Sequence, residues 1–173
     1  NILKEVNMMA SRDVAVLRDK GLPDEIHRIL VPVGGGPNAR LALQMARDIA
    51  TPGDAEVVGL RLVLGEADEE RMEDEELQLH EIAEAELGDI TENIRLKVRR
   101  AESVADEILK ECYEGHYDLL IMGCAEEILA PDQLFGKLND YLLDVVPCSM
   151  MIVRRYQTGT TLWMRKQLKK IEQ

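Results

Sequence analysis

The chain has 173 residues, of which 46% are hydrophobic and 31% charged, and its formal net charge is −12 at pH 7. This length predicts one domain with a core of its own, and the hydrophobic content excludes an intrinsically disordered chain. The acidic balance argues against nucleic acid as a partner, because duplex binding depends on Lys and Arg side chains that neutralise phosphates. No apolar run is long enough for a bilayer span, so we expect none within this sequence.

The charge is unevenly distributed along the chain. Residues 66–92 hold thirteen acidic side chains against the single base Arg71, whereas residues 154–173 hold six bases against Glu172 alone. The acidic run is typical of a solvated helix face, or of a surface that binds a divalent ion or a basic partner. The basic tail, which contains Trp163, is typical of a terminal helix, or of a segment that lies on a membrane surface or on an acidic partner helix.

The cysteines and the N-terminus indicate the compartment. Cys112, Cys124 and Cys148 form no C-x-x-C pair, and their odd number leaves one over in any disulfide scheme. Because their sequence surroundings are apolar or strand-like, we expect buried free thiols in a reducing cytoplasm. The histidines have no metal-ligand spacing, so no metal site is predicted, and no export signal is recognisable. A start at Asn1 rather than Met suggests a piece cut from a longer chain.

The first strand and helix can be predicted from apolar patterning. Residues 1–26 predict a helical lead-in or linker, because apolar positions recur near helical spacing until Gly21-Leu22-Pro23. The nearly continuous apolar run Arg28–Val33 is typical of a parallel strand that is covered on both faces. The turn Gly34–Asn38 then opens a helix whose apolar residues share one face. Together these segments predict one βα unit.

The alternation of strand and helix continues along the chain. The predicted elements are, in order, strand Glu56–Leu64, helix Glu69–Leu87, strand Asn93–Arg99, helix Ser103–Glu114, strand Tyr117–Met122, a helix through Leu138 and Leu143, and strand Ser149–Val153. Within the strand Asn93–Arg99, residues 94–99 alternate strictly between apolar and basic side chains, which predicts one wet face and a place at the sheet edge. Residues 117–122 include a continuous apolar run, which predicts a central strand.

These elements predict an α/β fold with an open parallel five-stranded sheet in the order 3-2-1-4-5 and helices on both faces. The α/β domain should span residues 27–155, after the lead-in 1–26 and before a basic tail 156–173. Ligands in such sheets bind beyond the carboxyl ends of the strands, where the strand order reverses. The glycine-marked turns Gly34–Asn38 and Gly123–Gly136 follow the two strands at that point, so we expect them to face each other across one crevice.

Several short motifs carry a family resemblance. They are Ile29-Leu30-Val31-Pro32-Val33 before a turn, Ala101 and Ser103 before a helix, the run Asp118–Gly123, and Val146-Pro147-Cys148 followed by Met151–Arg154. In this order and spacing, residues 28–154 resemble the universal stress protein family, which has an adenine-nucleotide α-hydrolase-like fold. The resemblance implies the sheet described above and a tendency to dimerise. It also implies, in the nucleotide-binding members, a glycine pattern G-x2-G-x9-G-[S/T] whose backbone N–H groups hold the triphosphate of ATP.

That glycine pattern is only partly present in this chain. Gly123 matches the first glycine and Gly136 the last, but Glu126 stands at the middle glycine and Lys137 at the closing hydroxyl residue. Gly34 stands where the nucleotide-binding members place an acidic residue that contacts the nucleoside. A carboxylate about 4 Å from a phosphate charge costs up to roughly 4 kcal/mol at an effective dielectric constant near 20. We therefore expect no cofactor, since ATP in the usual family mode is disfavoured.

The candidate ligand crevice is formed by the residues at the two turns. They are Val33, Gly34, Gly35, Gly36, Asn38, Gly123, Cys124, Glu126, Gly136 and Lys137. The backbone N–H groups of Gly35 and Gly36, together with Lys137, could receive a small anion, although a flexible turn and a solvated lysine explain the same residues. No nucleophile has a base near it in the sequence, so neither catalytic residues nor an enzyme are predicted.

The sequence therefore predicts a non-catalytic regulatory or interaction domain of universal-stress-protein type. The start without Met and the extra terminal segments, with the resemblance to domains fused to transporters, predict attachment to an amino-acid or cation transporter on the cytosolic side of the membrane. The alternative is a free-standing ATP-binding universal stress protein. The apolar last strand, Ser149, Met150, Met151, Ile152 and Val153, would leave an open sheet edge, so we expect a homodimer through that edge.

Overall fold

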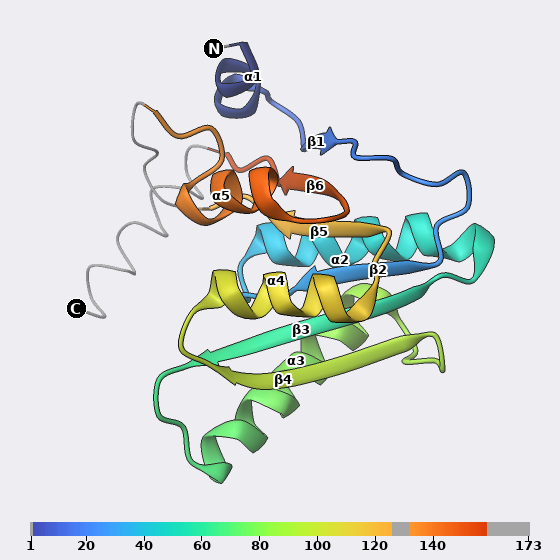
Figure 1. The fold of residues 1–173 in the computed structure, drawn as a ribbon, viewed down its shortest axis with the longest axis vertical. Helices are drawn as coiled ribbons and strands as arrows, with labels where there is room; N and C mark the ends of the chain where they lie inside the picture. The colour runs from blue at the N-terminus through green and yellow to red at the C-terminus, as the bar shows by residue number, and fades with distance from the viewer. Residues whose placement is uncertain (1, 126–131, 159–173) are drawn as a thin grey trace.

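The computed structural model describes residues 2–125 and 132–158. Within these ranges one sheet holds six strands in the order β1-β6-β5-β2-β3-β4 (Figure 1). The elements, in chain order, are α1 (Ile2–Met9), β1 (Val14–Arg18), β2 (Arg28–Pro32), α2 (Pro37–Ala50), a 3₁₀ turn (Thr51–Gly53), β3 (Glu56–Leu64), α3 (Glu69–Leu87), β4 (Ile94–Ala101), α4 (Val104–Gly115), β5 (Leu119–Gly123), α5 (Lys137–Val145) and β6 (Ser149–Arg154).

The parallel part of the sheet confirms the predicted strand order. β2 pairs in parallel with β3 on one side and with β5 on the other, and the pairs β3–β4 and β5–β6 are also parallel. Reading from β4 to β6 therefore gives the order 3-2-1-4-5 in the numbering of the predicted strands. β4 lies at the edge, as its alternating sequence predicts.

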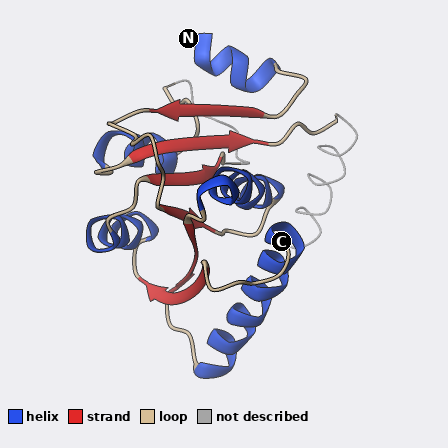
Figure 2. Cartoon of the chain, turned by 90° about the vertical axis from the view of Figure 1, so that its right-hand side faces the viewer, coloured by secondary structure: helices blue, strands red, loops and turns tan. Residues whose placement is uncertain are grey.

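The core lies on both faces of the central strands. Ile29, Leu30 and Val31 of β2 are fully buried, as expected of an apolar run covered on both sides. The helices α2 and α3 pack against one face of the sheet, and α4 and α5 pack against the other. Figure 2 shows the strands as a stack with helices on both sides. The predicted α/β layering is confirmed.

The N-terminal segment differs from the predicted helical lead-in. The helix α1 ends at Met9, and Val14–Arg18 forms β1, which pairs antiparallel with β6. Residues 14–17 are all apolar, so their pattern is compatible with a strand as well as with a helix. They form a strand because they pair with the edge of β6, whose backbone N–H and C=O groups would otherwise lack partners there. The edge Ser149–Val153 is therefore covered within the chain. The open edge on which the homodimer prediction rests is absent from the described structure, so two copies could pair through residues 149–153 only if β1 left that edge.

Most of the acidic run forms an exposed face of α3, as predicted, but Glu86 is buried beside Arg40 and Glu75 is largely buried beside Arg61. Asp68 caps this helix, because its side chain accepts a hydrogen bond of 2.9 Å from the Arg71 N–H. The opposite face buries Leu79, Ala83 and Leu87 against the sheet. Among the described residues, no helix combines the length and the apolar character that crossing a bilayer requires.

A buried ionic cluster joins β4 to α4. The Glu111 carboxylate is 2% exposed and accepts hydrogen bonds from Lys97 Nζ at 2.7 Å and from the Tyr117 hydroxyl at 2.5 Å, and it pairs with Arg99 at 2.7 Å. Burial raises the pKa of Glu111, but these hydrogen bonds and the Arg99 charge outweigh it, so the pKa lies below its ordinary value. The basic face of β4, predicted to be wet, is thus partly covered by α4.

The three cysteines are buried and free, as the sequence predicts. Cys112, Cys124 and Cys148 are each at most 8% exposed, and they belong to the apolar cluster between the sheet and the helices α4 and α5. They act there as small hydrophobic side chains.

Candidate functional site

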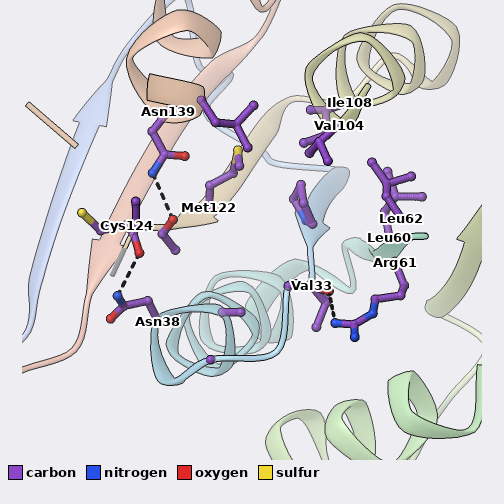
Figure 3. A pocket seen from close by; sticks show the side chains of 17 residues that line it. Val33, Asn38, Leu60, Arg61, Leu62, Val104, Ile108, Met122, Cys124 and Asn139 are labelled. Carbon is purple, nitrogen blue, oxygen red and sulfur yellow. Dashed lines mark hydrogen bonds between the residues drawn. The ribbon is translucent and has the colours of Figure 1, made fainter. Parts of the chain in front are cut away.

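The two glycine-marked turns meet in one crevice, as the strand order predicts. A cavity of about 420 Å³ opens beyond the carboxyl ends of β2, β3 and β5. Six of the predicted residues line it, namely Val33, Gly34, Gly36, Asn38, Gly123 and Cys124. They come from segments almost 90 residues apart in the chain, which the parallel sheet brings to the same edge (Figure 3).

The other predicted residues lie outside this cavity wall. Gly35 is in the first turn but not in the wall, and its φ of +103° requires glycine there. Gly136 precedes α5 with a φ of +104°, and Lys137 begins that helix as an exposed side chain. Glu126 lies outside the described residues, as does most of the basic tail.

Gly123 has a packing reason to be glycine. A Cβ atom at this position would lie 2.7 Å from the Asn38 carbonyl carbon and 2.8 Å from the Ala39 nitrogen. Both are backbone atoms, which cannot swing away as a flexible side chain would. The first glycine of the nucleotide pattern is therefore needed for the end of β5 to approach the start of α2, whatever the crevice binds.

Two buried asparagines hold the backbone that follows β5. Asn38 Nδ2 donates to the Cys124 carbonyl at 2.9 Å, while its Oδ1 accepts from the Arg155 N–H at 2.8 Å. Asn139 Nδ2 donates to the Gly123 carbonyl at 3.0 Å and to the Phe135 carbonyl at 3.2 Å. Figure 3 shows the two amides on opposite sides of this strand end. Their hydrogen bonds fix the crevice wall, so both N–H groups of the Asn139 amide and one of the Asn38 amide are already engaged.

Arg61 supplies the charge in the described wall. Its Nε pairs with Glu75 of α3 at 2.8 Å, and one terminal nitrogen donates to the Val33 carbonyl at 2.9 Å. Less than a fifth of either side chain in this ion pair is exposed. Arg61 therefore ties the turn after β2 to both β3 and α3. Sequence reasoning missed this residue, although a lone base in the apolar strand 56–64 was a usable signal.

Most of the remaining wall is apolar. Sequence reasoning also missed these side chains, because each belongs to an element that the patterning explains by core packing alone. The apolar members include Leu60, Leu62, Val104, Ile108, Met122 and Leu138. An apolar cavity with a few oriented polar groups is the usual form of a small-molecule site.

The described wall offers little for proton transfer or nucleophilic attack. Its ionisable side chains are Arg61, which is paired, and Cys124, whose Sγ lies 3.5 Å from the Phe135 carbonyl. None of the three histidines is among the lining residues. The arrangement can hold a ligand, but the described part places no base beside a nucleophile.

Comparison with known proteins supports the assignment that the fold suggests. The family model described as "Universal stress protein family" matches residues 25–154. The chain belongs to this family. A search among curated proteins found no match.

Solved universal stress proteins share the fold at low sequence identity. A universal stress protein in complex with cAMP is 15% identical with a TM-score of 0.59, and the match covers 75% of this chain and 97% of that one. A universal stress protein from Lactobacillus plantarum is 20% identical with a TM-score of 0.55, covering 76% and 100%. One from Archaeoglobus fulgidus is 15% identical with a TM-score of 0.66, covering 90% of this chain and 54% of that one. These likenesses establish the fold alone.

Proposed function

We propose that this universal stress protein domain is a non-catalytic regulatory module whose crevice binds a small molecule reversibly. The proposal depends mainly on one observation. The polar side chains of the described wall form hydrogen bonds and an ion pair within the protein that stabilise the wall. The amides of Asn38 and Asn139 donate to backbone carbonyls, and Arg61 is divided between Glu75 and the Val33 carbonyl. The described wall supports a shaped apolar pocket rather than a reaction centre.

The same proposal disfavours a triphosphate in the usual family mode. Three positions depart from the pattern of the nucleotide-binding members. Glu126 stands at the position of a glycine, and Lys137 stands at the position of a hydroxyl residue. Gly34 stands at the position of the acidic residue that contacts the nucleoside. The described wall also supplies only Arg61 as a cation, and Glu75 already neutralises it. A triphosphate would therefore find no free cationic side chain in the described wall and would depend on backbone N–H groups, where the glycine pattern is incomplete.

A free-standing nucleotide-binding universal stress protein is the second candidate function. It is favoured by the place of the cavity at the reversal of strand order, and by structures of the same fold in complex with cAMP and with dAMP. On this alternative the crevice would take an adenine nucleotide through contacts other than the family's glycine pattern.

A thermal-shift titration separates the two candidates. The full chain is melted with millimolar Mg-ATP, ADP, AMP or cAMP, and a ligand at about 100 times its Kd should add roughly 2.7 kcal/mol to the free energy of unfolding. We expect no shift with Mg-ATP. The matched control is Gly34→Leu, because nothing lies within 4 Å of a Cβ at Gly34, so the side chain can enter the cavity. A shift with any of these nucleotides that Gly34→Leu abolishes would favour the second candidate.

We further propose that the domain is attached to an amino-acid or cation transporter on the cytosolic side of a membrane. The resemblance stated above supports this, as does an N-terminal segment, outside the family match, that packs onto the sheet. The coding sequence upstream of Asn1 tests it directly. It should continue into several hydrophobic spans, and a start codon next to Asn1 would contradict the attachment.

A further inference from the structure

β1 lies outside the residues that the family model matches. The family match begins at residue 25, whereas β1 comprises Val14–Arg18 and lies at the edge of the sheet. Figure 1 shows it beside β6, on the far side of the sheet from β4. Its five residues pair antiparallel with residues 150–154 of β6. The chain thus supplies a sixth strand to a sheet whose other five strands are parallel.

The contacts that hold β1 are mainly backbone pairing and polar bonds near the surface. Val16 is the residue of β1 that packs against the core cluster, while Leu17 is 44% exposed. Arg18 pairs with Asp144 at 3.0 Å, and both side chains are more than half exposed. Lys20 donates through its N–H to the Ser149 hydroxyl at 2.9 Å and through Nζ to the Val146 carbonyl at 2.7 Å. Exposed ion pairs contribute little, so β1 is bound more weakly than the central strands.

The strand beneath β1 is well suited to pair with another strand. β6 has mostly buried side chains, and without β1 its outer N–H and C=O groups would be unpaired. Two copies of β6 can pair antiparallel about a two-fold axis, which makes a closed, self-complementary contact. β1 already supplies an antiparallel partner in this position. A second copy could therefore use the same edge only after β1 had left it.

We propose that β1 is an intramolecular cover that keeps β6 from pairing with β6 of a second copy. With β1 in place the chain is monomeric at this edge, and loosening β1 produces an edge-to-edge dimer. The proposal concerns the sheet edge and is independent of what the crevice binds.

The structure provides a matched pair of proline variants. The Cys124 N–H donates to the Val153 carbonyl at 2.7 Å, so the polar groups of Val153 face β5 and those of its neighbour Ile152 face β1. Val16, the register partner of Ile152, therefore directs its N–H toward β6, whereas the N–H of Leu17 faces away. Val16→Pro removes a ladder hydrogen bond, while Leu17→Pro places the same ring where an edge strand tolerates it.

Sedimentation equilibrium of the full chain across micromolar to submillimolar concentrations measures the result. We expect the native chain and Leu17→Pro to remain at the monomer mass of 19.5 kDa, and Val16→Pro to approach twice that mass. Amide hydrogen exchange identifies the edge. In dimeric Val16→Pro, the amides of Ile152 and Arg154 should be protected in a concentration-dependent manner.

A native chain that is already dimeric at low micromolar concentration would overturn the proposal, and so would a folded Val16→Pro that stays monomeric. Circular dichroism reports whether Val16→Pro folds. If it does not, the double variant Arg18→Met and Lys20→Met, which removes the Arg18–Asp144 ion pair and the Lys20 Nζ–Val146 hydrogen bond, must increase dimerisation by a smaller amount. A dimer that Val16→Pro weakens would indicate exchange of β1 between copies, which also contradicts an intramolecular cover.

Discussion

Gly123→Ala should lower the free energy of unfolding by about 2–3 kcal/mol, because the added methyl group meets backbone rather than a movable side chain. The new Cβ would lie within 3 Å of atoms in Asn38 and Ala39, so β5 and α2 must separate. That separation would also strain the bond of 2.9 Å between Asn38 Nδ2 and the Cys124 carbonyl. Urea unfolding followed by circular dichroism measures the loss.

Gly34→Ala is the matched control for this variant. Gly34 lines the same cavity, but a Cβ there meets nothing within 4 Å, and its φ is not in the left-handed region. We expect its free energy of unfolding to change by less than about 1 kcal/mol, with a small gain from the reduced entropy of the unfolded chain. Equal losses in both variants would show that close packing is not the reason for glycine at residue 123.

Glu111→Gln should cost about 2–4 kcal/mol at neutral pH, somewhat less than the roughly 3–5 kcal/mol that is typical when one partner of a fully buried ion pair is removed. The amide keeps an acceptor for the Tyr117 hydroxyl but loses the charge that pairs with Lys97 and Arg99. Those two bases are about one third exposed, so water compensates them in part. Glu114→Gln, at an exposed position of the same helix, serves as the control and should be nearly neutral.

The pH dependence of this difference follows from the depressed pKa of Glu111. The Glu111 carboxyl has a lower pKa in the folded chain, so it binds protons more readily in the unfolded chain. Its contribution to the free energy of unfolding is therefore complete at pH values above 4.5, the ordinary pKa of a glutamate, which applies to the unfolded chain. The stabilisation is lost as the pH falls from there through the folded pKa. The stability gap between the native chain and Glu111→Gln should therefore narrow in acid, and a gap that stays constant down to pH 3 would contradict the ionised assignment.

The parallel sheet could be predicted because each of its strands carries its own signal. The apolar runs at residues 29–31 and 119–122 indicate central strands, and the alternation at residues 94–98 indicates an edge. The order of the strands then places the two glycine-marked turns at one crevice. These inferences depend on local patterning and general topology, and the structure confirms them.

The features that could not be predicted depend on contacts between distant residues. β1 is stabilised by β6, more than 130 residues away, and the sequence of residues 14–18 fits a helix nearly as well as a strand. The side chains of Asn38 and Arg61 donate hydrogen bonds to backbone carbonyl groups that are distant in the sequence. Local sequence patterns do not predict such contacts. Gly123 illustrates a different limit, because a position that resembles a phosphate contact is also required by packing.

Titration calorimetry of Mg-ATP into the full chain is the most direct test of the proposed module. The comparison is with the triple variant Gly34→Asp, Glu126→Gly and Lys137→Ser, which restores the acid, the glycine and the hydroxyl residue of the family pattern. We predict no measurable heat of binding for the native chain at millimolar nucleotide, and binding once all three substitutions are made. A native chain that binds Mg-ATP with a micromolar Kd, unchanged in the triple variant, would contradict the account.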